Sequence, residues 1–130
     1  MYRNRTLENT IKLAEKHFKV ILLTGMRQVG KTTFLKHIYG NINYVTLDDP
    51  KILLEAKSEP ELFFQRYKFP LLIDEVQYAP ELFPYIKMLV DSSDKNGQLF
   101  ITGSQQYSLM KNVRESLAGR AAIIDMLGFS

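Results

Sequence analysis

Short apolar runs alternate with amphipathic stretches along the chain. Most runs are apolar at every position, which predicts strands covered on both faces in a parallel sheet. Between them, apolar residues recur every three or four positions, the spacing of a helix with one buried face. Five strands are expected, over residues 20–24, 43–47, 69–74, 97–103 and 121–126.

Helices are expected between the strands. A first helix carries Leu7, Ile11, Ala14 and Phe18 on one face, and a second runs from about Lys31 to Gly40. Further helices are expected over residues 51–56, 60–67, 81–91 and 107–117, the last broken near Asn112. This alternation predicts an α/β fold of βαβ units with right-handed crossovers. The expected core comprises Ile21, Leu22, Leu23, Val45, Leu47, Leu71, Leu72, Ile73, Leu99, Phe100, Ile101, Ile123 and Ile124.

The loop after the first strand carries the most specific motif. Residues 25–32 read G-x-x-x-x-G-K-T and lead into the second helix. In that setting the backbone N–H groups between the glycines form a concave nest for phosphate oxygens, and the helix N-terminus adds to it. Lys31 then reaches the β- and γ-phosphates, and the Thr32 hydroxyl is a ligand for Mg²⁺. The expected nucleotide contacts are Gly25, Arg27, Gln28, Val29, Gly30, Lys31, Thr32 and Thr33.

Two carboxylates end the third apolar run. Asp74 and Glu75 are therefore expected at the carboxyl edge of the sheet, where ligands bind in open α/β folds. Asp74 is predicted to hold the Mg²⁺ shell, and Glu75 to act as general base on the attacking water. The alternative is an acidic helix cap after a core strand. The presence of the glycine loop in the same chain favours the nucleotide interpretation.

A small polar cluster follows the fourth apolar run. Ser104, or as second choice Gln105, is expected to contact the γ-phosphate or to orient water beside Glu75. The alternative is a polar turn rich in hydrogen-bonding residues.

Composition agrees with a single cytoplasmic domain over residues 1–130. The chain has 45% hydrophobic and 24% charged residues and no cysteine, so disulfides and thiolate metal sites are excluded. No apolar run approaches a membrane span, and no signal peptide is visible. The net charge of +3 comes without any block of like charges, so it indicates nucleic-acid binding only weakly.

Five ordered segments, LTGMRQVGKTT, VTLDDP, LLIDEVQYAPEL, ITGSQQYSLM and ESLAGR, resemble the N-terminal half of a prokaryotic group of AAA-type P-loop ATPases. Members of that group are longer and carry a C-terminal domain of unknown function. The resemblance implies a P-loop three-layer sandwich with a mainly parallel five-stranded sheet of AAA-like order and helices on both faces. In that order the Ser104 strand separates the loop strand from the Asp74 strand, which places Ser104 in a sensor role and makes Glu75 the catalytic glutamate.

The resemblance also implies that a residue from a neighbouring subunit or domain completes the γ-phosphate site. In AAA-type enzymes an arginine from a neighbouring subunit or domain often completes the γ-phosphate site, and Arg120, or else Arg114, is the candidate. Self-association is one expected partner interaction, and an absent C-terminal domain is another. Most relatives have Pro where this chain has Met26. The usual helical subdomain is missing, and the chain stops directly after a strand, which suggests a fragment of a longer protein.

Three functions remain open from the sequence. The first is an Mg²⁺-dependent ATPase module that couples its nucleotide state to a partner or second domain. The second is a nucleotide-gated interaction switch for a protein or DNA, with little hydrolysis of its own. A small-molecule kinase is the third, although no segment resembles a lid with several arginines.

Overall fold

The structure is a computed structural model that describes residues 2–25 and 28–126, with the side chains of residues 5–25 and 33–126. The helices, with 3₁₀ turns labelled η, are α1 (Tyr2–His17), α2 (Gln28–Ile38), α3 (Pro50–Ser58), α4 (Pro60–Arg66), η1 (Val76–Tyr78), η2 (Pro80–Leu82), α5 (Phe83–Asp91) and α6 (Tyr107–Leu117). The strands are β1 (Val20–Thr24), β2 (Asn43–Thr46), β3 (Leu71–Asp74), β4 (Leu99–Thr102) and β5 (Ala121–Asp125). No helix among the described residues is long and apolar enough to cross a membrane.

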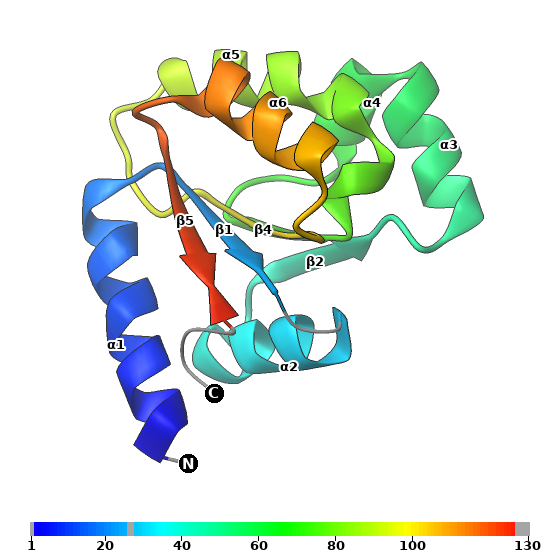
Figure 1. The fold of residues 1–130 in the computed structure, drawn as a ribbon. Coiled ribbons are helices and arrows are strands. Elements are labelled where there is room, and N and C mark those ends of the chain that lie inside the picture. Colours follow the sequence, from blue (N-terminus) through cyan, green and yellow to red (C-terminus); the bar gives the residue numbers. More distant parts are fainter. Residues whose placement is uncertain (1, 26–27, 127–130) are drawn as a thin grey trace.

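All five strands form one parallel sheet in the order β2-β3-β4-β1-β5. Helices α1 and α2 lie on one face and α3 to α6 on the other, which makes three layers (Figure 1). The predicted fold class and strand order are confirmed, with β4 between β1 and β3.

The core forms one apolar cluster on each face of the sheet, because the strand residues alternate between faces. Val20, Leu22 and Ile73 pack with α3 to α6, whereas Ile21 and Leu23 pack with α1 and α2. The three central strands, β1, β3 and β4, are buried at every position, as their continuous apolar sequences predict.

Three local predictions were wrong. Helix α6 is continuous at Asn112, because Leu109, Val113 and Leu117 form one buried stripe along it. Ile123 is 43% exposed rather than core, because β5 is an edge strand that pairs only with β1 and the helices of that face leave its side chain uncovered. The expected helix 81–91 begins as the separate 3₁₀ turn η2 and becomes α-helical only at Phe83.

Candidate functional site

All five strands end in a hydroxyl or a carboxylate at the same edge of the sheet. The last residues of β1 to β5 are, in that order, Thr24, Thr46, Asp74, Thr102 and Asp125. Because the strands are parallel, these ends meet at the carboxyl edge, and Thr46 lies beside Asp74 in the strand register. The chain thus gathers polar groups that lie 78 positions apart, as the numbers of Thr24 and Thr102 show.

Asp74 is held by three hydroxyl groups. Its side chain is 4% exposed. Thr102 Oγ1 donates to Oδ1 at 2.5 Å, while Tyr44 Oη and Thr46 Oγ1 each lie 3.3 Å from Oδ2. Burial, followed by the Asp74 charge, raises the pKa of Tyr44 above its usual range, so its hydroxyl keeps the proton that it donates. Hydrogen bonds to an ionised acceptor are strong, and Asp74 is therefore fixed in one orientation.

Glu75 adopts an unusual backbone conformation. Its φ of 60° and ψ of 51° lie in the left-handed region, and it is the one non-glycine residue with positive φ in the described chain. Its backbone N–H donates to Thr102 Oγ1 at 3.1 Å, and Gln77 Nε2 donates to its Oε1 at 2.8 Å. The other carboxylate oxygen, Oε2, is buried without a hydrogen-bond partner among the described residues. A buried, unpaired acceptor at a strained residue marks a functional position.

The loop after β4 meets Glu75 through Gln77. The backbone N–H of Ser104 lies 3.4 Å from Gln77 Oε1, and Ser104 Oγ is a second buried polar atom without a partner in the described chain. Gln105 is not beside the carboxylates: its side-chain amide reaches Thr24 Oγ1 at 3.4 Å, at the end of β1. Of the two candidates in this loop, the structure brings Ser104 to the Glu75 side.

The carboxylates suit a hard divalent cation. Asp48, Asp74 and Glu75 each place one carboxylate oxygen so that all three lie within 4.8 Å of one another. Asp48 follows β2, where its backbone N–H donates to Thr46 Oγ1 at 3.1 Å. Oxygen donors of this kind are the ligands that Mg²⁺ takes, and the unpaired Oε2 of Glu75 is free to bond to metal-bound water. The residues present therefore fit the predicted ion.

The glycine loop enters the same edge of the sheet. Gly25 directly follows β1 with a φ of 105°, a conformation that favours glycine, and α2 then begins at Gln28. Its first helical turn contains Gly30, and Thr33 is exposed. Arg27 lies outside the described residues, as do the side chains of Gln28, Val29, Lys31 and Thr32, so their roles stay predictions.

Arg120 lies at the opposite, amino edge of the sheet. It directly precedes β5, and its guanidinium forms two hydrogen bonds with Asp91, at 2.6 and 2.9 Å. This pairing raises the pKa of Arg120 and lowers that of Asp91. Arg114, on α6, has its guanidinium carbon 5.9 Å from the ring centre of Tyr107. Arg120 therefore does not reach the Asp74 of its own chain, and a role for it requires a second copy.

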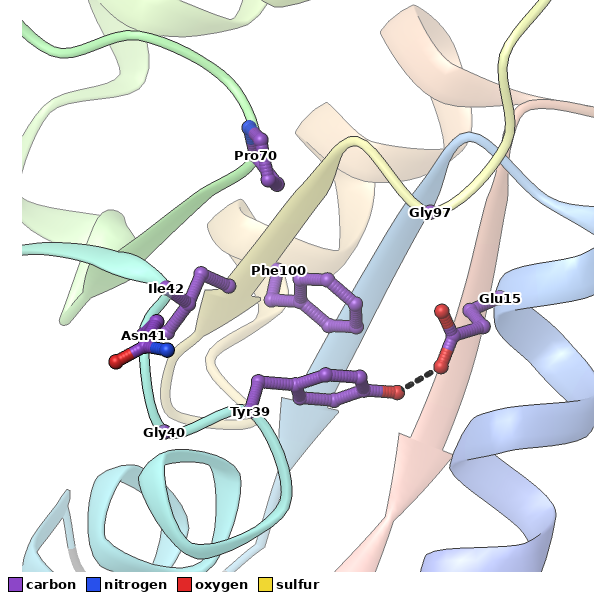
Figure 2. A pocket seen from close by; sticks show the side chains of 8 residues that line it. All are labelled: Glu15, Tyr39, Gly40, Asn41, Ile42, Pro70, Gly97 and Phe100. Atoms are coloured by element: carbon purple, nitrogen blue, oxygen red, sulfur yellow. Dashed lines mark hydrogen bonds between the residues drawn. The ribbon is translucent and has the colours of Figure 1, made fainter.

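A cleft of about 360 Å³ also lies at the amino edge, between α1 and the turn after α2. Figure 2 shows Tyr39 along the lower side of the cleft, donating a hydrogen bond to Glu15, with the Phe100 ring next to the Tyr39 ring. Neither of the predicted nucleotide contacts whose side chains or backbone positions are fully described, Gly25 and Thr33, lines it. Phe100 is only 1% exposed, so a ligand in the cleft could contact little of this apolar side chain.

Several residues at the site escaped prediction: besides Tyr44, Thr46 and Thr24, which supply hydroxyl groups, and Asp48, which lies with the carboxylates, Thr102 and Gln77 connect the predicted residues. Thr102 bonds to both Asp74 and Glu75, and Gln77 bonds to Glu75 and Ser104. The signal for Thr102 is its place as the last residue of an apolar run, the same place that Asp74 has in its own run. No local pattern distinguishes Gln77, because its contact with the β4 loop depends on the fold.

Comparison with known proteins gives a family and several relatives. A family model described as "AAA domain" matches residues 17–130. An uncharacterized protein of Mycobacterium tuberculosis is 33% identical over 112 residues, which cover 85% of this chain and 25% of that protein. An uncharacterized protein of Methanocaldococcus jannaschii is 32% identical over 136 residues, covering 90% of this chain and 27% of its own length. The chain thus spans about a quarter of the length of the curated relatives that it matches.

Proposed function

We propose that this chain, which belongs to the AAA-domain family and is an ATP-binding module of the AAA type, hydrolyses ATP in an Mg²⁺-dependent reaction and passes its nucleotide state to a partner or second domain. The observation that carries the proposal is the Oε2 of Glu75, a buried acceptor one residue after Asp74 to which no side chain or backbone group of residues 5–25 and 33–126 forms a hydrogen bond. A water molecule that donates a hydrogen bond to this oxygen would give it the partner that it lacks among the described residues. Such a water would lie at the carboxyl edge of the sheet, where α2 begins.

Glu75 acts as the general base. The water oxygen forms a bond to the γ-phosphorus while the bond from that phosphorus to the β–γ bridging oxygen breaks. The proton of the water goes to Glu75 Oε2, and the products are ADP and inorganic phosphate. Thr102 holds the Glu75 backbone and the Asp74 carboxylate through one hydroxyl, so the base and the neighbouring carboxylate are positioned together.

The remaining predicted residues neutralise or sense charge. Lys31 binds the β- and γ-phosphates. Thr32 and Asp74 hold Mg²⁺, which when bound supplies positive charge to the phosphate oxygens. Ser104 Oγ, buried and unpaired, donates to a γ-phosphate oxygen.

Arg120 is proposed as an arginine supplied in trans. Its position at the amino edge leaves it available only to the site of a second copy, and it would have to exchange its bonds with Asp91 for the γ-phosphate. Such an arginine stabilises the charge that develops in phosphoryl transfer.

The test is ATP hydrolysis by the purified chain with and without Mg²⁺, compared with Lys31→Ala and Glu75→Gln. Lys31→Ala should abolish nucleotide binding, and Glu75→Gln should keep ATP affinity and lose turnover by about a hundredfold or more. ATP binding by Lys31→Ala that equals the wild type would refute the phosphate-loop assignment. An unchanged rate in Glu75→Gln would remove Glu75 as base, and tight ATP binding without turnover by the wild type would favour the nucleotide-gated switch.

A further inference from the structure

Gln77 connects two parts of the site that are distant in the sequence. It lies in η1, directly after the Asp74–Glu75 pair, and both ends of its side-chain amide are engaged. The Nε2 group donates to Glu75 Oε1 at 2.8 Å, and Oε1 lies 3.4 Å from the backbone nitrogen of Ser104. One planar amide therefore bridges the carboxylate of Glu75 and the loop after β4.

The two buried polar atoms without partners lie on the two residues that this amide joins. They are Glu75 Oε2 and Ser104 Oγ. An unpaired buried polar atom costs free energy, so each of these atoms needs a partner that the described chain does not provide. Gln77 thus joins the two residues whose unpaired atoms can hydrogen-bond to a ligand, Ser104 Oγ as a donor and Glu75 Oε2 as an acceptor.

The backbone fixes the position of Glu75 but not the orientation of its carboxylate, and the hydrogen bond from Gln77 constrains that orientation. The left-handed conformation of Glu75 and its N–H bond to Thr102 fix where the side chain starts. The side-chain torsions stay free unless the carboxylate itself is held, and Gln77 Nε2 is the donor that holds it. With Oε1 fixed, Oε2 points in one direction.

The fold keeps room for this amide. A Cβ atom added at Gly103 would lie 3.1 Å from Gln77 Oε1 and 2.5 Å from Leu109 Cδ2. The first distance is tight and the second is a clash, so the glycine allows the β4 loop to approach both side chains closely.

We propose that Gln77 is a positioning residue that fixes the Glu75 carboxylate and couples it to the Ser104 loop. The inference rests on the proposed function, because it assigns to Gln77 the orientation of the proposed base. A displacement of Ser104 by a bound phosphate moves the backbone N–H that donates to Gln77 Oε1, and the change reaches Glu75 through the amide. The orientation of the base then depends on the occupancy of the γ-phosphate position.

The first test replaces the amide by a side chain of similar length. Gln77→Met removes the donor and the acceptor, and it should lower kcat about tenfold to a hundredfold while KM for ATP changes less than about threefold. Gln106→Met is the matched control, since Gln106 is the N-cap residue before α6 at the end of the same loop, is exposed and makes no side-chain capping hydrogen bond. The control should keep the wild-type kcat. A kcat for Gln77→Met within twofold of the wild type would overturn the proposal, because a merely structural role would change only stability.

A second measurement works without turnover. The unfolding equilibrium constant in urea is determined for Gln77→Met, Glu75→Ala and the double variant. A coupling factor of about tenfold supports the Gln77–Glu75 link, since the acceptor is charged and buried, and a factor below about twofold overturns it.

The two proposals fail differently. If the wild type does not hydrolyse ATP, or if Lys31→Ala hydrolyses it equally well, the proposed function fails, and the coupling factor then decides the role of Gln77. If Lys31→Ala abolishes turnover and Gln77→Met leaves kcat unchanged, the positioning role fails and the proposed function stands.

Discussion

Thr102 is the residue on which both carboxylates depend, and Thr102→Val tests that dependence. The side chain is fully buried, and its Oγ1 donates to Asp74 Oδ1 at 2.5 Å while it accepts from the Glu75 N–H at 3.1 Å. Valine keeps the shape of threonine and removes only this hydroxyl. The substitution leaves a buried N–H without an acceptor and a buried carboxylate without its shortest hydrogen bond.

The expected cost follows from these two losses. A hydrogen bond to a charged group contributes about 1.5–3 kcal/mol, and an unpaired buried donor costs about 1–3 kcal/mol. Burial of the added methyl group offsets about 1 kcal/mol. The free energy of unfolding should therefore fall by about 1.5–5 kcal/mol, a large part of the roughly 5–15 kcal/mol that stabilises an ordinary domain.

Urea unfolding of Thr102→Val measures this change, with Thr24→Val as the matched control. Thr24 is equally buried and also ends a central strand, but the side-chain hydrogen bond that the described residues give it is a long one, accepted from Gln105 at 3.4 Å, so the control should lose less than about 1 kcal/mol. Thr102→Ser, which keeps the hydroxyl, should recover at least half of the loss. Equal destabilisation by the two valine variants would show that the Thr102 bridge contributes nothing specific.

Other predictions concern the amino edge of the sheet. Because Arg120 lowers the pKa of Asp91, their pairing stabilises the fold fully above about pH 4 and is lost as the pH falls through the lowered pKa of Asp91. Asp91→Asn should therefore lower Tm at pH 7, and the difference from the wild type should shrink steadily below about pH 4. Burial and Glu15 raise the pKa of Tyr39, so the folded state should lose stability as the pH rises above about 10. Tyr39→Phe should lose less over the same range, which unfolding followed by fluorescence measures. Arg120→Ala should reduce turnover only at concentrations where subunits meet; a reduction independent of concentration contradicts a trans role.

The sequence alone determined the elements and the chemistry of their ends. Strand and helix periodicity depends on neighbouring residues, and so does the spacing of a glycine loop, which is why the fold class, the order of the strands and helices along the chain and the place of Asp74 at a strand end could be predicted. The limits of two strands were less exact, since β3 and β4 each begin two residues later than the apolar runs predict. Reasoning from neighbouring residues failed where the position of a strand in the sheet decides how exposed its side chains are. Ile123 has the sequence pattern of a core residue, but it is exposed because it lies on an edge strand.

Only the tertiary structure decided which polar groups meet. The sequence indicated the loop after β4 and favoured Ser104, whereas the contact with Asp74 comes from Thr102, 28 positions along the chain from that carboxylate. The hydrogen bond from Gln77 to Glu75 depends on the turn after β3. The position of Arg120 at the amino edge of the sheet depends on the strand order. Hydrogen bonds of this kind require two separate elements to be brought within about 3 Å, and no local pattern in either element carries that information.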